Sequence, residues 1–209
     1  MINDSLNIKT TPFHLFESKV PLDVCDKLRE ANSAITDSKF LSNIMSEKVA
    51  EWESISNSKF KQSVDFKKVM KNVNPNALNT IASPGLPPEF SRVVSSLVLP
   101  KSNYEYLVQM IKCSHIDWHS DKYVLNKELK CVDGIFLVCL SDNPLCSEFR
   151  LNTGHSHTLK KGDLIFFDDH IEHSLLPPLN SSYNENQLNN SAMQFASMQR
   201  LKNLGDGYN

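Results

Sequence analysis

The sequence predicts an α+β fold, with helices in the first half of the chain and a barrel or jelly roll of strands in the second. Apolar residues recur at helical spacing as far as residue 98. From Tyr104 they alternate with other residues, and β-branched and aromatic side chains become frequent. No helical pattern separates the later strands, which argues against a parallel α/β sheet.

Four helices are predicted before residue 100. They cover residues 21–31, 40–55, 64–73 and 88–98. Pro21 suits the first turn of the first helix, because the nitrogen of a first-turn residue needs no partner within the helix. A cluster of Asn, Pro and Gly over residues 74–88 separates the third helix from the fourth.

The strands are predicted from Tyr104 onward. Residues 134–140 are apolar on both faces, which is typical of an interior strand. The other candidates are residues 104–111, 148–151, 164–167, 173–176 and 193–201. Turn-forming residues such as Gly154 and Gly162 lie between them.

Length and charge restrict the class of protein. A chain of 209 residues with 40% hydrophobic residues is expected to form one domain, in which residues 1–100 pack on a core formed by residues 101–209. A net charge of -2 argues against a nucleic-acid partner. The longest apolar run, residues 135–140, is too short for a membrane span, and the first residues do not resemble a signal peptide. We therefore expect a cytoplasmic protein.

Two His-x-Asp motifs carry the chemical signal. His115 and Asp117 form the first, and His119 and Asp121 form the second. In extended backbone, residues two apart point to the same side, so one such motif can offer two ligands to one metal. A third imidazole from a neighbouring strand would complete the two-histidine, one-carboxylate face of non-haem Fe(II) oxygenases. Zn and Mn also accept these ligands, so the residues alone leave the metal open.

A later segment resembles a known family. Residues 161–177 contain a Gly-Asp turn, an apolar strand that ends at Phe167, and His173 followed by an apolar-Pro tail. This order resembles the distal-histidine strand pair of the 2-oxoglutarate and Fe(II)-dependent dioxygenases, and it looks closest to their prolyl-hydroxylase-like branch. The resemblance covers about residues 104–200 and implies a double-stranded β-helix (jelly-roll) core. It also implies Fe(II), 2-oxoglutarate as cosubstrate, O2 as substrate, and succinate and CO2 as co-products.

The resemblance implies a catalytic metal site formed by His119, Asp121 and His173. The competing motif at His115 and Asp117 stays open, although the residues around His119 look more like the family's segment. His170 is the alternative distal ligand, whereas the segment that follows His173 matches the family pattern. His155 and His157 alternate with polar residues and have no assigned role.

One family element is missing. The family places an Arg or Lys about ten residues after the distal histidine, where it pairs with the far carboxylate of 2-oxoglutarate. Here the position ten residues after His173 lies in a polar loop over residues 180–191, and the next predicted strand begins with Met193. The candidates for the carboxylate partner are, in order, Arg200, Arg150 and Lys130, with the phenol of Tyr106 as a further contributor.

Two functions remain from these observations. The first is a dioxygenase that hydroxylates a small molecule, an amino acid or a peptide. The second is a cupin-like jelly-roll metal-binding module without oxidative turnover, which the missing cation favours.

Overall fold

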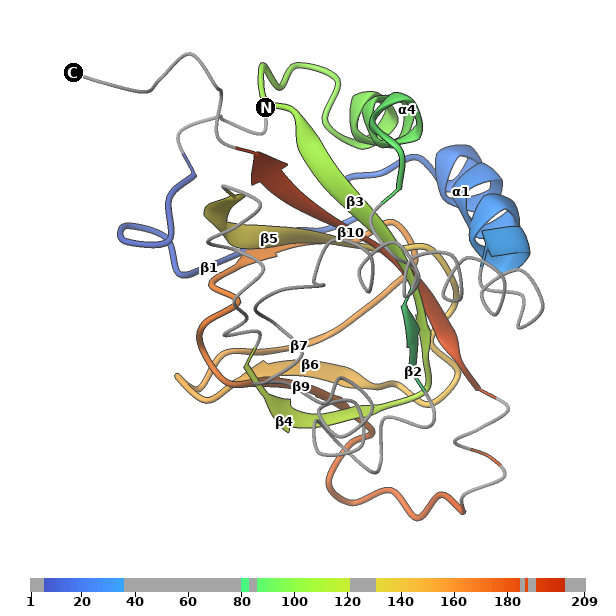
Figure 1. Ribbon diagram of the computed structural model, residues 1–209. Coiled ribbons are helices and arrows are strands. Elements are labelled where there is room, and N and C mark those ends of the chain that lie inside the picture. The colour runs from blue at the N-terminus through green and yellow to red at the C-terminus, as the bar shows by residue number, and fades with distance from the viewer. Residues whose placement is uncertain are drawn as a thin grey trace, which may run out of the picture.

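The computed structural model describes residues 6–35, 80–82, 86–120, 131–184, 187 and 191–201. These residues form two antiparallel sheets and two helices (Figure 1). The strand order is β1-β8-β5-β10-β3-β2 in the larger sheet and β4-β9-β6-β7 in the smaller one. Because neighbouring strands are far apart in sequence, the chain crosses between the sheets repeatedly.

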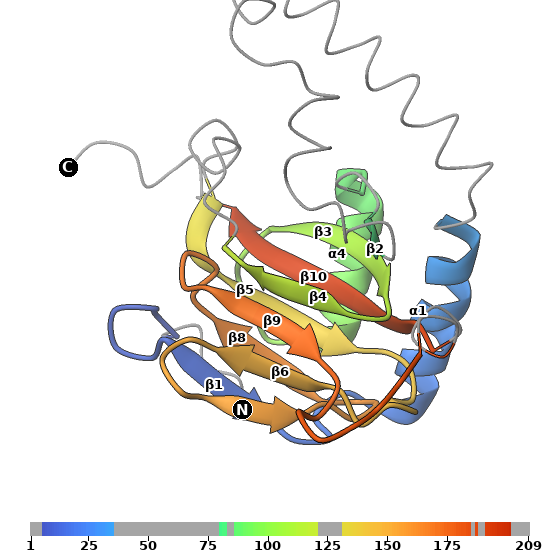
Figure 2. The ribbon, with the colours of Figure 1, turned by 90° about the horizontal axis from the view of Figure 1, so that it is seen from below.

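The two sheets face each other, as Figure 2 shows from below. The larger sheet contains β1 (Phe13–Phe16), β2 (Thr80–Ala82), β3 (Tyr106–Cys113), β5 (Cys131–Cys139), β8 (Leu164–Phe167) and β10 (Met193–Leu201). The smaller sheet contains β4 (Ile116–His119), β6 (Glu148–Leu151), β7 (Ser156–Thr158) and β9 (His173–Leu176). This arrangement is a jelly roll, as the sequence predicts.

Buried side chains fill both faces of the larger sheet. On β10, Phe195 faces the smaller sheet and packs in a cluster with Phe149 and Phe167. The neighbouring residues Ala196 and Met198 point the other way and pack in a second cluster beneath the helices. Residues one apart on a strand point to opposite faces, so β10 is apolar on both of them. This alternation decides which side chains reach the space between the sheets.

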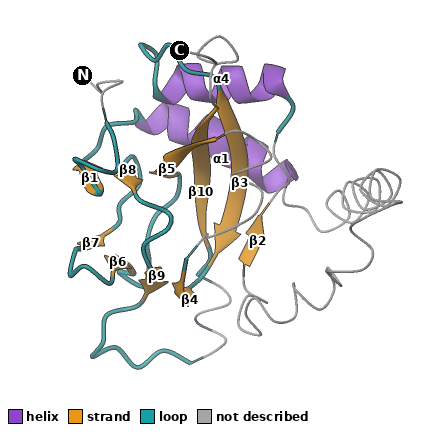
Figure 3. Cartoon of the chain, turned by 60° about the vertical axis from the view of Figure 1, so that its left-hand side comes forward, coloured by secondary structure: helices purple, strands orange, loops and turns teal. Residues whose placement is uncertain are grey.

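The helices α1 (Leu22–Ile35) and α4 (Pro88–Val98) cover the outer face of the larger sheet (Figure 3). They correspond to the first and fourth predicted helices, whereas residues 40–55 and 64–73 lie outside the described part of the chain. In α1, Cys25 and Leu28 are buried, and Asn32 donates a hydrogen bond of 2.9 Å to the carbonyl of Ile111. That bond fixes α1 on β3. No helix among the described residues is long and apolar enough to cross a membrane.

Four strands have the predicted bounds, namely β6, β8, β9 and β10. The predicted strands over 104–111 and 134–140 correspond to β3 and β5, with shifted ends. At Gly162, before β8, φ is +91°, and a Cβ atom there would lie 2.9 Å from the carbonyl oxygen of Val20. Only glycine fits this turn, so the turn signal in the sequence corresponds to a close approach of two backbone segments.

Candidate functional site

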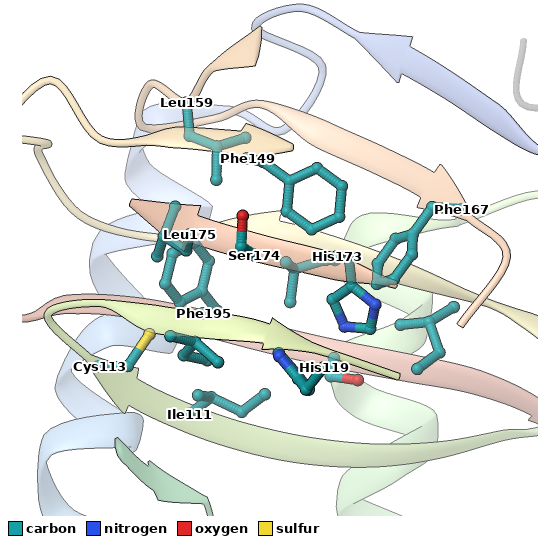
Figure 4. A pocket seen from close by; sticks show the side chains of 14 residues that line it. Ile111, Cys113, His119, Phe149, Leu159, Phe167, His173, Ser174, Leu175 and Phe195 are labelled. Atoms are coloured by element: carbon teal, nitrogen blue, oxygen red, sulfur yellow. The ribbon is translucent and has the colours of Figure 1, made fainter. Parts of the chain in front are cut away.

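His119 and His173 lie opposite each other in the smaller sheet. His119 ends β4, His173 begins β9, and their Cα atoms are partners in the register of the two strands. Their ring centroids are 4.3 Å apart, and the rings are tilted by 54° (Figure 4). His173 is buried and also contacts the rings of Phe149 and Phe167, at 5.9 and 4.9 Å. The fold therefore brings together two imidazoles that are 54 residues apart in the sequence.

Backbone carbonyls set the tautomer of both histidines. The Nδ1 atom of His119 lies 2.7 Å from the carbonyl oxygen of Asp117, and Nδ1 of His173 lies 2.9 Å from that of Ile171. A carbonyl oxygen only accepts, so each neutral ring carries its proton on Nδ1 and its lone pair on Nε2. Histidines that bind metals are commonly oriented by such a bond from their other nitrogen. The pair is therefore prepared to hold a metal through Nε2. Sequence analysis missed the two carbonyl groups that orient the histidines, because backbone hydrogen bonds leave no pattern of side chains in the sequence.

The third predicted ligand, Asp121, lies outside the described residues. Its role therefore stays a prediction. Of the competing motif, neither His115 nor Asp117 lines the cavity next to the histidine pair, whereas His119 does. The side chain of His115 contacts Ser114 instead, with Nδ1 3.3 Å from the hydroxyl oxygen.

The remaining second-half histidines contact carboxylates or aromatic rings away from the cavity. His157 Nε2 lies 3.0 Å from the buried carboxylate of Asp163, and His155 packs on the ring of Phe13. His170 lies in the loop between β8 and β9, with Nδ1 3.2 Å from Asp168 Oδ1. Asp168, Asp169 and His170 have ligand atoms within 4.8 Å of one another. The carboxylate of Asp169 also accepts a hydrogen bond from the backbone nitrogen of Gly134, which gives this cluster a structural role.

A cavity of about 90 Å³ lies between the sheets beside the histidine pair. Its lining is mostly apolar and consists of Ile111, Cys113, Ile116, His119, Ile135, Leu137, Phe149, Leu159, Phe167, His173, Ser174, Leu175, Phe195 and Ser197. In Figure 4 the histidines occupy one end of the cavity, and Cys113 lies toward the other. Burial raises the pKa of the Cys113 thiol to about 12, so this group is neutral at physiological pH.

Comparison with known proteins agrees with this architecture. No family model and no curated protein matches the sequence. Among solved structures, HygX from Streptomyces hygroscopicus, with nickel, 2-oxoglutarate and hygromycin B bound, is similar with a TM-score of 0.50 and 11% identity. The match covers 94% of this chain and 85% of HygX. The chain has the fold of the 2-oxoglutarate and Fe(II)-dependent oxygenases.

Two prolyl hydroxylases are also similar to this oxygenase-fold chain. One is the viral collagen prolyl hydroxylase vCPH from Paramecium Bursaria Chlorella virus-1, with a TM-score of 0.49 and 14% identity over 93% of this chain and 98% of that protein. The other is a prolyl-4-hydroxylase from Pseudomonas putida, with a TM-score of 0.47 and 11% identity over 94% and 96% of the two chains.

Within this oxygenase fold, the predicted carboxylate partners that the structure describes do not line the cavity. Arg200 points to the helix side of β10, where its guanidinium lies over the rings of Tyr104, Phe136 and Phe166 at 5.2 to 5.9 Å. It lies an odd number of residues from the cavity-lining Ser197, and strand alternation therefore places it on the opposite face.

The other two described candidates, Arg150 and Tyr106, also lie away from the cavity. Arg150 forms an ion pair with Glu148 Oε2 at 2.9 Å. Both residues are neighbours of the cavity-lining Phe149 on β6, so their side chains point to the opposite face of the strand. Tyr106 is buried in the cluster beneath the helices, and its hydroxyl lies 2.7 Å from that of Ser102. Lys130 lies outside the described residues.

Proposed function

We propose that the protein is an iron-dependent oxygenase that uses a 2-oxo acid as cosubstrate and hydroxylates a small molecule, an amino acid or a peptide. The observation that supports this proposal is the His119–His173 pair, with both Nε2 lone pairs prepared by backbone carbonyls at the wall of a cavity. Asp121 follows His119 by two residues and is the third ligand in this proposal.

The donor set fits Fe(II), because two imidazoles and one carboxylate are the ligands of non-haem oxygenases. When bound, Fe(II) with a 2-oxo acid supplies the oxidising power that an unactivated C–H bond requires. The chain itself holds the ligands and limits access of water, since Phe149 and Phe167 pack against His173. 2-Oxoglutarate is the cosubstrate that the sequence resemblance implies, with succinate and CO2 as its products.

Metal retention tests this proposal. Wild-type protein and the variants His119→Ala, His173→Ala and Asp121→Ala are incubated anaerobically with Fe(II), desalted and analysed for bound iron. We expect the three variants to lose the metal and to keep the wild-type circular dichroism spectrum. His115→Ala and His170→Ala serve as matched controls and are expected to retain it. Loss of iron in the His115 variant, with retention in the His119 variant, would mean that the other His-x-Asp motif supplies the ligands.

A second candidate function is a jelly-roll metal-binding module without oxidative turnover, and the apolar lining of the cavity favours it. Oxygen consumption separates the two functions. An oxygenase consumes O2 when Fe(II) and a suitable 2-oxo acid are added, whereas a binding module retains the metal without consuming O2. The 2-oxo acid must be varied in this assay, because the lining of the cavity determines which acid fits beside the metal.

A further inference from the structure

The geometry points to a 2-oxo acid with an apolar side chain, rather than 2-oxoglutarate, as the cosubstrate that this cavity accepts. The inference rests on the proposed function, because it concerns the molecule held beside the metal. A 2-oxo acid chelates a metal through its carboxylate and its oxo oxygen. Its side chain then extends away from the metal into the protein, so the lining of the cavity selects that side chain.

Apart from the hydroxyl of Ser174, apolar side chains form the part of the cavity away from the histidines. Cys113, Leu159 and Leu175 line it (Figure 4). Met193, the first residue of β10, pairs with Cys113 in the register of β3 and β10 and is 1% exposed. Met193 packs in the same cluster as Cys113 and Leu159, and it therefore supports this end of the cavity.

The charge of this lining disfavours a second carboxylate. The Cys113 thiol stays neutral, the Ser174 hydroxyl is uncharged, and the remaining side chains at this end are hydrocarbons or a thioether. An ionised carboxylate placed here would lose its hydration without gaining a charged partner among the described lining residues. An alkyl group in the same place would instead bury apolar surface favourably. The described part of the lining therefore favours an alkyl side chain over a carboxylate.

The size of the cavity limits the side chain. A volume of about 90 Å³ is well below the roughly 300–1,000 Å³ of sites that take drug-sized ligands. A short side chain is therefore expected, and 4-methyl-2-oxopentanoate, which has a short, branched alkyl group, is a suitable probe. In the balanced reaction this acid loses CO2 and becomes 3-methylbutanoate. One atom of O2 enters that product and the other enters the hydroxylated substrate, and the 2-oxo acid and the C–H bond each supply two electrons.

Calorimetry on metal-loaded protein tests the inference without relying on turnover. Protein is loaded with Ni(II), which binds the same ligands without oxygen chemistry, and is titrated with 4-methyl-2-oxopentanoate and with 2-oxoglutarate. We expect the wild-type protein to bind the apolar acid at least about tenfold more tightly. This comparison needs no variant and does not depend on the folding of one.

A designed charge provides a second test. Met193→Arg places a guanidinium at the apolar end of the cavity and is expected to reverse the preference in favour of 2-oxoglutarate. Gln194→Arg is the matched control, since it adds the same charge one residue along β10, where Gln194 contacts Ser33 of α1. We expect this control to keep the wild-type preference.

The outcomes separate this inference from the proposed function. If the protein retains Ni(II) but binds 2-oxoglutarate more tightly, or binds neither acid, the inference is wrong and the metal site stands. If it retains no metal, the proposed function fails and the inference fails with it. Tighter binding of the apolar acid, reversed only by Met193→Arg, supports the inference.

Discussion

The guanidinium of Arg200 donates a hydrogen bond of 2.7 Å to the backbone carbonyl of Leu6. These residues are 194 positions apart, and Arg200 is only 4% exposed. The same guanidinium contacts three aromatic rings beneath the helices. Arg200 therefore fixes the segment before β1 to the last strand of the larger sheet, on the side away from the cavity.

Replacing Arg200 should reduce stability and leave ligand binding unchanged. In Arg200→Met, the Leu6 carbonyl loses its donor and the rings lose a desolvated cation, so we expect the free energy of unfolding to fall by about 2 kcal/mol. Urea denaturation measures this loss, and calorimetry on the Ni(II)-loaded variant measures 2-oxo acid binding. Arg150→Met is the control, and because its ion pair with Glu148 is partly exposed we expect a loss below about 1 kcal/mol. A stable Arg200 variant that binds the 2-oxo acid more weakly would show that Arg200 contributes to ligand binding after all.

Gly134 in β5 should not tolerate a side chain. Its φ is +96°, and a Cβ atom would lie 2.7 Å from Cζ of Phe166 and 2.9 Å from Cγ2 of Ile8. We expect Gly134→Ala to lower the free energy of unfolding by more than about 1 kcal/mol.

Gly154→Ala is the matched control for Gly134→Ala. Gly154 has a similar φ of +95°, but a Cβ atom there would contact nothing within 4 Å. The difference between the two variants in thermal or urea unfolding isolates the steric contact from the backbone conformation. Equal losses would show that Phe166 and Ile8 move aside at no cost.

Two buried thiols should make the protein less stable in alkaline solution. Burial raises the pKa of Cys113 and of Cys139 from 9.0 to about 12. Below pH 9 the thiols are protonated in both states, but between about 9 and 12 the unfolded chain loses their protons and the native state keeps them. The free energy of unfolding should therefore fall by up to about 1.4 kcal/mol per pH unit for each thiol in this range.

Urea unfolding at a series of pH values from 8 to 10.5 tests this dependence. Other groups titrate in the same range, so the double variant Cys113→Ala/Cys139→Ala provides the baseline. We expect it to be less stable than wild type at pH 8, because cavities are created, and to lose less stability as the pH rises. Parallel curves for the two proteins would show that these thiols do not contribute.

Local patterns were sufficient to predict several elements. β8 is a short apolar segment after a Gly-Asp turn, β9 ends directly before Pro177, and the predicted bounds of both strands are confirmed. β1 was not predicted; it precedes the helical part of the chain and is a strand through its pairing with β8, which lies far later in the sequence. In α4 the predicted apolar face includes Phe90, which is 60% exposed, whereas Ser91 is buried. Which helix face packs inward depends on the sheet beneath it.

The candidate site was likewise predicted only in part. Residue identity and family resemblance led to His119 and His173, which the structure places together. The position of Arg200 could not be predicted, because it depends on which face of β10 points to the smaller sheet. A one-residue change of strand register reverses that assignment for every side chain, and register is determined by pairing with distant strands.

The central position of β10 has a consequence for how the chain folds during synthesis. β10 lies between β3 and β5, and pairs with both, although both precede it in the sequence. Until residues 193–201 leave the ribosome, each of these strands has an unpaired backbone edge facing an empty place in the sheet. Open edges on apolar strands promote association between chains. A nascent chain of this protein is therefore expected to depend on chaperones that bind extended segments until β10 is inserted.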